Sequence, residues 1–462
     1  MNRKILFFKN KSFNISEINL KKKKIIKCLP IKRPLVFIFS ESNINFLFFY
    51  ISLLESDAVF FVLDNNTNQE NLNKLIIKFN PNYLVIPQNS KIKINNNSSL
   101  KIINGYKIYL NNPQNIKLNK NLKLLLSTSG TTGPSKFVML SKQNIEINTK
   151  QICKYLKIDH HDNVILNLPL HYSYGLSIFN THFYKKSKIY LSNYSVLDKN
   201  FWKLSKKIGL SCFYGVPQNF DFIKRVNLSS LKLKKIKFMA VAGGKISTTT
   251  LRDMCNKAKK NSFNFFNMYG QTEASPRIGY SSFFDKKQNI EFISKAVEGG
   301  KLIVKNEKGR ILKKVGSQGF LYYHGKNVMI GYAETQKDLF KNRKNNFLIN
   351  TNDIAKIKKN NQYEVIGRSD KFIKINSKKI NLNEVEIFLK KYVDIVACVE
   401  NSNKINIFLE KKTISNINLK KKIADYTNLN QNTFNVIKLK KIPRTSNHKI
   451  NYFKLKSLNT FS

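Results

Sequence analysis

The chain has 462 residues, with 81 Lys and Arg against 28 Asp and Glu, so its formal net charge is +53. This length allows two or more domains and a large hydrophobic core. No apolar run is long enough to span a bilayer, and the apolar segment within residues 1–9 is too short for a signal peptide. We therefore expect a globular, cytoplasmic protein without a membrane span.

The excess of positive charge has two interpretations. A polyanionic partner such as nucleic acid would use it. However, only nine of the 81 basic residues are Arg, and the abundant Lys, Asn, Ile and Phe all have A/T-rich codons. A biased genome composition explains these residues together, and the lysines are dispersed along the chain. We therefore expect no nucleic-acid partner, and a nucleic-acid-binding protein remains an alternative that rests on charge alone.

Two features of the Cys and His residues bear on redox and metal chemistry. The cysteines are odd in number and form no CxxC pair, which is typical of buried, inert thiols in a reducing compartment. They are Cys28, Cys153, Cys212, Cys255 and Cys398. The Asp-His-His-Asp run at 159–162 resembles a metal cluster only superficially, because adjacent loop residues do not converge easily on one ion. We predict a polar turn there.

Apolar runs and helical patterns alternate through the first part of the chain. We expect strands at 34–39, 58–64 and 83–87, with helices at 43–55 and 71–79. Strand–helix–strand alternation predicts a mostly parallel sheet with helices on its faces.

Further elements follow a connection. Residues 88–120 are polar and predict a weakly specified connection, after which Ser141 can cap a helix that ends near Leu156. Residues 213–220 predict a strand, a Gly/Pro turn and the start of a helix. Residues 238–245 predict a strand that ends in paired glycines, whose flat backbone can lie against a planar base.

A Ser/Thr/Gly segment follows the apolar run 124–126 and ends at Lys136. Gly130 and Gly133 let the backbone approach a phosphate closely, successive N–H groups form an anion-binding concavity, and Lys136 adds a charge. The segment is not a Walker A loop, because the two glycines are too close together and Lys136 does not follow a glycine. It predicts polyphosphate binding, although loops of this composition are also common without a ligand.

A second motif, Asn-Met-Tyr-Gly-Gln-Thr-Glu, occupies residues 267–273. Tyr269 offers a ring that can stack on adenine. Thr272 can contact an α-phosphate, and Glu273 is a hard oxygen ligand suited to Mg²⁺.

These two motifs resemble those of the AMP-forming acyl-adenylating enzymes, which include acyl-CoA synthetases, nonribosomal-peptide adenylation domains and luciferases. Residues 129–136 resemble the phosphate-loop signature of that family. The resemblance extends in six ordered motifs from about Leu35 to Lys449, the later ones at 319–332, 351–353, 367–374 and 443–450. It implies an α/β acyl-adenylate synthetase fold. A large N-terminal domain (1–366) of mostly parallel sheets flanked by helices would join, through a hinge (367–370), a small mobile α+β lid domain (371–462).

The resemblance also implies an ATP site. The leaving phosphates would be held by Lys136 and by the loop residues Thr128, Ser129, Gly130, Thr131, Thr132 and Gly133. The nucleoside would be bounded by Gly243, Gly244, Tyr269, Gly270 and Gln271, with Asp353 on both ribose hydroxyls and Arg368 near the ribose.

Five further roles follow from the same resemblance. Thr272 would contact the α-phosphate, Glu273 would hold Mg²⁺, and Lys449 would reach the carboxylate and the α-phosphate. Asp370 would be the pivot of the hinge. The aromatic gate of the acid site falls on His171 or Tyr172, because the His stands one place early.

The implied activity is a two-step ligation with ATP and Mg²⁺ as cofactors. A carboxylate would attack the α-phosphorus, release pyrophosphate, and pass as an acyl group to CoA or to the phosphopantetheine of a carrier protein. Gly175 stands where amino-acid-activating relatives carry Asp, so an α-amino acid substrate is disfavoured. Asn352, Ser377 and His448 replace glycines of the family pattern. These changes leave open a degenerate member that binds ATP or adenylate without ligation.

Overall fold

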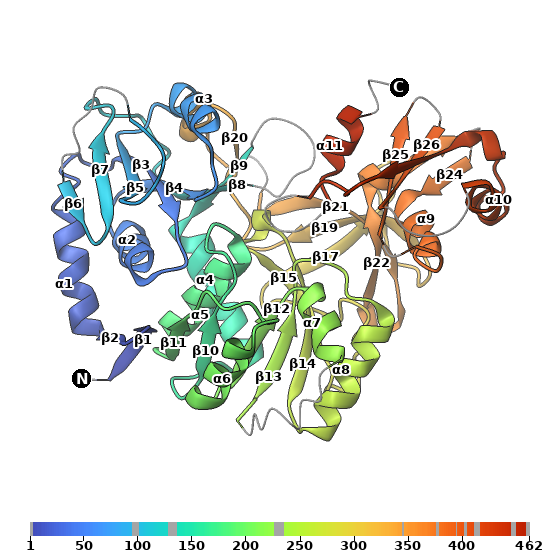
Figure 1. Ribbon diagram of the computed structural model, residues 1–462, viewed down its shortest axis with the longest axis horizontal. Coiled ribbons are helices and arrows are strands. Elements are labelled where there is room, and N and C mark those ends of the chain that lie inside the picture. Colours follow the sequence, from blue (N-terminus) through green and yellow to red (C-terminus); the bar gives the residue numbers. More distant parts are fainter. Residues whose placement is uncertain are drawn as a thin grey trace.

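The computed structural model of the 462-residue chain (Figure 1) describes most of it. The described residues are 3–94, 101–127, 136–225, 235–343, 346–375, 378–393, 395–401, 404–410, 416–444 and 450–458. Within them, two large sheets, one antiparallel sheet and two small C-terminal sheets make up the β structure.

The first large sheet has eight strands in the order β20-β9-β8-β4-β3-β5-β7-β6. Its central strands run parallel, as expected from the strand–helix alternation. The bounds are β3 Leu35–Ser40, β4 Val59–Asp64, β5 Tyr83–Pro87, β6 Lys101–Ile103, β7 Tyr106–Leu110, β8 Leu122–Ser127, β9 Phe137–Ser141 and β20 Gly331–Ala333.

Residues 88–120, predicted as a weakly specified connection, contain a regular hairpin in their middle part. Strands β6 and β7 form an antiparallel hairpin that extends the sheet beyond β5. Its turn is Asn104-Gly105, and both residues have positive φ, 48° and 71°. Asn-Gly is a strong hairpin signal because both residues tolerate this conformation. The polar, Lys-rich composition of the surrounding residues masked that signal.

The second large sheet has nine strands in the order β16-β15-β14-β13-β12-β10-β11-β1-β2, with β14 through β1 parallel. The bounds are β1 Lys4–Phe8, β2 Lys11–Asn14, β10 Asn163–Leu166, β11 Lys188–Leu191, β12 Cys212–Gly215, β13 Phe238–Val241, β14 Asn264–Gly270, β15 Arg277–Ser282 and β16 Lys295–Ala296. Strands β1 and β2 were not expected. The alternation of apolar and polar residues over 4–14 is too weak to predict a hairpin at the edge of a sheet.

Helices form layers on both sides of each sheet. The helices α1 (Ile15–Ile26), α2 (Ile44–Glu55), α4 (Lys142–Leu156) and α5 (Ser173–Tyr184) pack between the two sheets in one apolar cluster. Helix α3 (Gln69–Phe79) covers the outer face of the first sheet. The outer face of the second is covered by α6 (Lys199–Ile208), α7 (Pro217–Lys224) and α8 (Thr248–Lys260). Because helices cover both faces of each sheet, the central strands appear in the sequence as continuous apolar runs.

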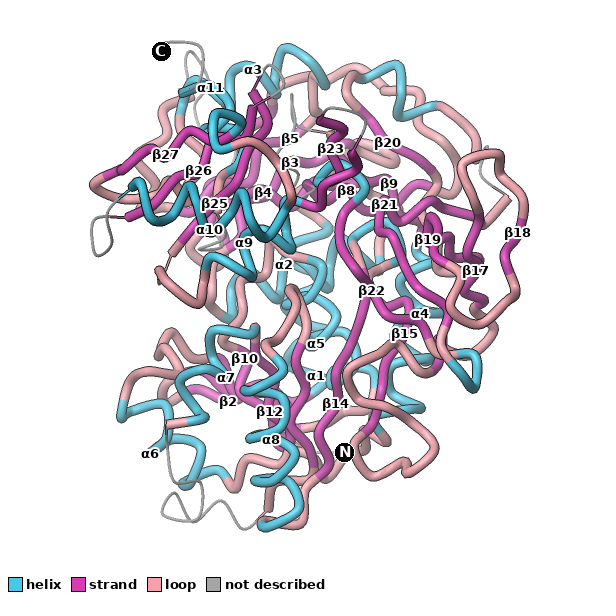
Figure 2. Tube along the Cα trace, turned by 90° about the vertical axis from the view of Figure 1, so that its right-hand side faces the viewer, coloured by secondary structure: helices cyan, strands magenta, loops and turns pink. Residues whose placement is uncertain are grey.

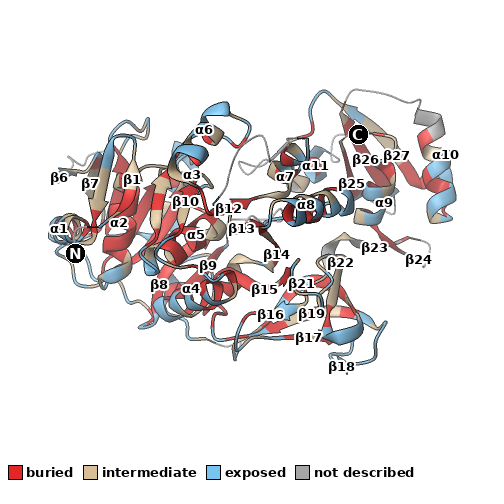
Figure 3. Ribbon diagram, turned by 90° about the horizontal axis from the view of Figure 1, so that it is seen from below, coloured by how far each residue is buried: buried red, intermediate tan, exposed pale blue. Residues whose placement is uncertain are grey.

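Burial explains why α2 is apolar nearly all round. Its residues from Phe46 to Leu53 are all buried, and Figure 3 shows buried residues concentrated in α2, α5 and the strands on either side. A helix packed between two sheets has no solvent face. Its predicted bounds are confirmed, with Asn43 accepting a hydrogen bond from the Phe46 amide as the N-cap. Ser141 caps α4 in the same way.

An antiparallel sheet with the order β18-β17-β19-β21-β22 follows in the chain (Figure 2). Its strands are β17 Lys301–Lys305, β18 Ile311–Leu312, β19 Gln318–His324, β21 Leu348–Ile357 and β22 Tyr363–Arg368. The backbone of Ile293, before β16, pairs with Tyr363 in β22 and joins this sheet to the second large sheet.

The C-terminal part has its own α+β arrangement. A hairpin of β23 (Phe372–Ile375) and β24 (Lys378–Asn381) precedes a three-stranded sheet, β25 (Val396–Asn401), β26 (Lys404–Glu410) and β27 (Phe434–Leu439). Its helices are α9 (Leu382–Leu389), α10 (Asn416–Thr427) and α11 (Tyr452–Ser457). Among all the helices described, none is long and apolar enough to cross a membrane.

Buried polar contacts tie this C-terminal part together. The Glu386 carboxylate accepts hydrogen bonds from the Tyr452 hydroxyl, at 2.9 and 3.0 Å, and lies 3.6 Å from the Lys371 ammonium. The Cys398 amide also donates to it. These contacts join the residue after the expected hinge to α9, α11 and β25.

Candidate active site

The expected site residues gather at one edge of the sheets, where the parallel strands end. Strand β14 ends at Gly270, β13 ends shortly before Gly243, and β8 ends at Ser127, just before the expected phosphate loop. Ligands of open α/β sheets bind at the carboxyl ends of the strands. The loop residues 128–133 and Lys449 lie outside the described residues, so the rest of the site is built from its other members.

Tyr269 and Asp353 meet although they are far apart in the chain. The Tyr269 hydroxyl donates a hydrogen bond to Oδ2 of Asp353, which lies in β21. Burial and the Asp353 carboxylate raise the pKa of Tyr269 well above its ordinary value, so the hydroxyl keeps its proton. Arg368 lies on the other side, with Nη1 3.8 Å from Oδ1 of Asp353 and 3.1 Å from the Thr351 carbonyl oxygen, to which it donates.

The backbone around Asp353 is held by its neighbours. The Thr351 hydroxyl donates to the Leu321 carbonyl at 2.8 Å and accepts from the Asp353 amide at 3.2 Å. Asn352 between them has φ = 57°. Asn is the non-glycine residue that best tolerates a left-handed backbone, so the replacement of the family's glycine is accommodated here.

Glu273 and Thr272 form the next part of the site, in a short 3-10 helix (Thr272–Ala274) after β14. Oε1 of Glu273 accepts a 2.8 Å hydrogen bond from the Tyr332 hydroxyl. Burial and Glu273 together raise the pKa of Tyr332. The Thr272 hydroxyl oxygen lies 3.1 Å from that of Ser173, at the start of α5.

Lys136 lies beside the same tyrosine. Its ammonium is 3.3 Å from Oε1 of Glu334 and 5.9 Å from the centre of the Tyr332 ring. This contact follows from the pairing of β20 with β9. Glu334 was not among the expected site residues, and Tyr332 entered only as the last residue of the motif at 319–332.

His171 and Tyr172 take different positions. His171 is buried, with Nδ1 3.3 Å from the Ser40 hydroxyl and Nε2 3.5 Å from Oδ2 of Asp64. Burial lowers the pKa of His171 while Asp64 acts to raise it. Ser40 and Asp64 are the last residues of β3 and β4, and sequence analysis gave them no role. Tyr172 is the N-cap residue of α5 and is partly exposed.

Glycines shape the expected nucleoside side of the site. Gly243 has φ = 85°, a conformation that other residues rarely adopt, and Gly244 lies beside it against Pro217. At Gly270, a Cβ atom would lie 2.0 Å from the Pro276 carbonyl oxygen, so no side chain fits. The Gln271 amide donates to that same oxygen at 2.8 Å.

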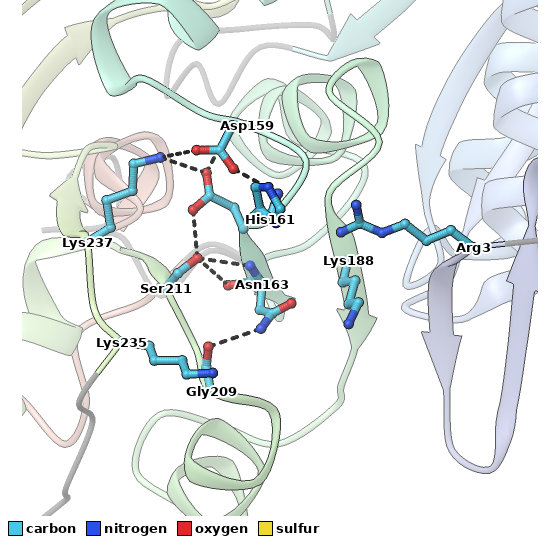
Figure 4. A pocket seen from close by; sticks show the side chains of 10 residues that line it. Arg3, Asp159, His161, Asn163, Lys188, Gly209, Ser211, Lys235 and Lys237 are labelled. Atoms are coloured by element: carbon cyan, nitrogen blue, oxygen red, sulfur yellow. Dashed lines mark hydrogen bonds and ion pairs between the residues drawn. The ribbon is translucent and has the colours of Figure 1, made fainter. Parts of the chain in front are cut away.

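The polar turn at 159–162 lies at the opposite edge of the second sheet. Figure 4 shows it in a surface pocket of about 500 Å³ beside the amino ends of β10 to β13. The Lys237 ammonium lies 2.8 Å from Asp159 and 3.1 Å from Asp162. The prediction of a polar turn is confirmed. Among the described residues, no group of three or more His, Cys, Asp or Glu side chains is placed to hold a metal ion. All five cysteines are buried, as expected.

Comparison with known proteins adds the family. Residues 31–333 match the family described as AMP-binding enzyme. Acyl-CoA synthetase ALT10 of Alternaria alternata is 25% identical over 289 residues, which are 57% of this chain and 50% of that protein. The mitochondrial medium-chain acyl-CoA ligase ACSF2 of Macaca fascicularis is 26% identical over 271 residues, or 56% of this chain and 43% of that protein. The match thus spans half the length or less of these curated relatives.

Solved structures share the fold over nearly the whole chain. ATP-bound MatB from Rhodopseudomonas palustris superimposes with a TM-score of 0.80 at 16% identity and covers 100% of this chain and 96% of that one. O-succinylbenzoate coenzyme A synthetase (MenE) from Bacillus subtilis, in complex with AMP, has a TM-score of 0.78 at 17% identity and covers 98% and 95%. The expected acyl-adenylate synthetase fold is therefore confirmed. Since the family match extends over more than half of the sequence, the chain belongs to the AMP-binding enzyme family of AMP-forming acyl-adenylating proteins.

Proposed function

We propose that this protein activates a carboxylic acid with ATP to an acyl-adenylate, releases pyrophosphate, and then transfers the acyl group to a thiol. The observation that carries the proposal is the meeting of Tyr269, Asp353 and Arg368 at the carboxyl edge of the strands, beside Thr272 and Glu273. This is the edge where an α/β sheet binds its ligands. The relatives named above are an acyl-CoA synthetase and an acyl-CoA ligase.

The described side chains suit the nucleotide half of the first step. The Asp353 carboxylate, fixed between Tyr269 and Arg368, can accept hydrogen bonds from both ribose hydroxyls. The Tyr269 ring and the side-chain-free backbone of Gly243 and Gly244 would enclose the adenine. In the reaction, a substrate carboxylate oxygen bonds to the α-phosphorus and the bond to the pyrophosphate oxygen breaks.

The charged groups would act on the phosphates. Lys136 and the loop 128–133 would hold the leaving pyrophosphate, and Thr272 would donate to the α-phosphate. Lys449 would lie on the negative charge shared by the attacking carboxylate and the α-phosphate, where a fixed cation lowers the barrier. The reaction then needs no nucleophilic side chain.

The residues present fit a magnesium ion. Mg²⁺ is usually bound by one or two carboxylates together with substrate phosphates. Glu273 supplies such a carboxylate, and the Tyr332 hydroxyl holds it in place. Bound there with ATP, the ion would neutralise phosphate charge. MenE of Bacillus subtilis has been solved in complex with ATP and a magnesium ion.

The acid site and the second step complete the proposal. We assign the aromatic gate to Tyr172, since His171 is engaged by Ser40 and Asp64. Tyr172 directly precedes Ser173, whose hydroxyl oxygen lies 3.1 Å from that of Thr272. For the second step, residues 371–462 would rotate about Asp370 so that CoA or a carrier-protein phosphopantetheine reaches the adenylate.

The test is pyrophosphate release from MgATP, without thiol, over a panel of fatty, aryl, hydroxy, dicarboxylic and amino acids. Release that depends on one class of acid, and is lost in Lys449→Ala, supports adenylation. Binding of ATP without release for any acid would instead favour a degenerate member of the family.

A further inference from the structure

Arg277, the first residue of β15, is a buried cation without an anionic partner. Its residue surface is only 3% exposed. The ion pairs of the described residues do not include it, and its Nε has no hydrogen-bond partner. Arginine is almost never fully buried unless it is paired, because removal of its charge from water is costly. A buried guanidinium with no carboxylate beside it among the described residues therefore indicates a place for an anion.

The backbone of Arg277 is held firmly. The Asn148 side chain in α4 bonds both its amide, at 3.0 Å, and its carbonyl oxygen, at 2.9 Å. The Asn327 side chain donates to the same carbonyl at 2.9 Å. Across the β14–β15 pair, Arg277 lies opposite Gly270, where only glycine fits. The backbone from which the Arg277 side chain extends is therefore fixed, beside the expected nucleotide site.

The guanidinium lies among aromatic rings. Its central carbon is 5.2 Å from the centre of the Tyr174 ring, in α5. Burial raises the pKa of Tyr155 and of Tyr174, and the positive charge of Arg277 acts in the opposite direction on both hydroxyls. A hydrogen bond between the Arg277 and Tyr155 side chains also lowers the pKa of Tyr155. The faces of such rings attract a cation but offset only part of the cost of its burial. The Tyr155 hydroxyl is a neutral partner, so within the described part of the chain the charge of the guanidinium has no anion beside it and its Nε–H has no acceptor.

The position of this fork relates it to the acid substrate. Tyr174 follows Ser173, whose hydroxyl oxygen lies 3.1 Å from that of Thr272, the expected contact of the α-phosphate. Arg277 itself is five residues after Thr272, at the start of the strand that turns back along β14. The acid's reacting carboxylate must lie near Thr272, so the remainder of the acid can extend toward Tyr174 and Arg277.

We propose that Arg277 binds a second carboxylate on the acid substrate, so that the protein activates a dicarboxylic acid at one end. The planar guanidinium suits this task, because its paired N–H groups match the two oxygens of a carboxylate. This inference rests on the proposed acid activation, which it narrows to a substrate class.

The test compares dicarboxylic acids with their monomethyl esters. Pyrophosphate release from MgATP is measured with succinate, glutarate and adipate and with each monomethyl ester. The proteins are the wild type, Arg277→Met, Arg277→Lys and a control, Arg33→Met. Arg33 is a half-buried arginine distant from the site, which donates to the carbonyl oxygens of Asn119 and Leu122.

For the best diacid we expect wild-type kcat/KM to exceed that for its ester by about tenfold to a hundredfold, as for a charged hydrogen-bonded pair. Arg277→Met should abolish this preference by lowering kcat/KM for the diacid while that for the ester stays the same or rises. Arg277→Lys should retain part of it, and Arg33→Met all of it. A wild type that prefers the ester, or an Arg277→Met variant that keeps the preference, overturns the inference.

A binding measurement separates this inference from the proposed function. The diacid, added with AMP, should raise the melting temperature of the wild type and of Arg33→Met but not that of Arg277→Met. If this dependence appears without pyrophosphate release from any acid, the proposed function fails and the Arg277 site stands. If pyrophosphate release occurs with acids that carry no second carboxylate and no dependence on Arg277 appears, the function stands and the site fails. Arg277→Met alone should melt no lower than the wild type, since it removes an unpaired buried charge; a marked drop would instead indicate a structural role.

Discussion

The Tyr332 hydroxyl donates a 2.8 Å hydrogen bond to the Glu273 carboxylate, across 59 residues of sequence. Tyr332 lies in β20, an edge strand. This strand pairs with β9, the strand that directly follows the expected phosphate loop in the chain. The same tyrosine ring lies 5.9 Å from the Lys136 ammonium. One side chain therefore contacts the proposed magnesium ligand and lies beside the proposed phosphate-binding lysine.

We expect Tyr332→Phe to weaken the use of magnesium. Loss of one hydrogen bond leaves Glu273 less well oriented, so the Mg²⁺ concentration for half-maximal pyrophosphate release should rise about twofold to tenfold. The control is Tyr322→Phe, whose hydroxyl lies at the limit of hydrogen-bonding distance, 3.5 Å from Nδ2 of Asn350. An unchanged magnesium dependence in Tyr332→Phe would show that this contact does not position the ligand.

Asp353→Asn should weaken nucleotide binding. The amide keeps the shape of the side chain but lacks the charge that would strengthen hydrogen bonds from the ribose hydroxyls. Its NH₂ group is a donor, so it cannot accept hydrogen bonds as a carboxylate oxygen does beside Tyr269 and Arg368. We expect the Kd for AMP, measured by calorimetry, to rise about tenfold to a hundredfold. Asp285→Asn is the matched control, because Asp285 pairs with Lys295 outside the proposed site. Equal affinities of Asp353→Asn and wild type would contradict the assignment of Asp353 to the ribose.

The two half-reactions should separate in two variants. Lys449→Ala should abolish adenylate formation but leave thioester formation from supplied acyl-AMP, since its cation is needed only while charge develops at the α-phosphate. Asp370→Pro should do the reverse, because it restricts the backbone at the proposed pivot. Equal loss of both steps in Lys449→Ala would argue against two catalytic conformations. Loss of adenylation in Asp370→Pro would mean that the hinge lies elsewhere.

Lys123 should make stability depend on pH. This residue is only 6% exposed, and its ammonium donates to the carbonyl oxygens of Ser56 and Ala58. Burial lowers the pKa of Lys123 from 10.5 to about 7. Between these two values the unfolded chain binds more protons than the folded one, so the stability contributed by this group rises with pH and is lost below about pH 7.

Chemical denaturation of the wild type and of Lys123→Met tests this. The free energy of unfolding of the wild type, minus that of the variant, should increase by up to about 1.4 kcal/mol per pH unit between about pH 7 and pH 10. Lys74→Met, at an exposed pair with Glu70, should show no such trend relative to the wild type. A difference that stays flat for Lys123→Met would mean that its two carbonyl contacts keep the ammonium charged throughout.

Local patterns were sufficient for the elements whose burial is complete. Strands β3, β4 and β5 and helix α2 are covered on all sides, so nearly all their residues are apolar. A short stretch of sequence is then enough to recognise each element. The motif at 267–273 is also local, and the structure places it at the end of β14, next to the sheet that carries Asp353.

Other features depended on contacts that no short window contains. Residues 4–14 become strands because β1 pairs with β11, and β7 becomes a strand because it pairs with β5. Both strands lie second from the edge of their sheets and are only partly buried. Such a strand gains much of its stability from its neighbours, so its own sequence carries a weak signal.

The sequence by itself determined the family, the succession of the central strands and helices along the chain, and the residue types available for nucleotide chemistry. These follow from short motifs and hydrophobic periodicity. Only the tertiary structure decided that Tyr332 orients Glu273, that His171 turns to Ser40 and Asp64, and that Arg277 is buried without a carboxylate beside it. The physical reason is that burial and ion pairing are set by residues distant in the chain, and these meet only when the sheets and the helices between them have packed.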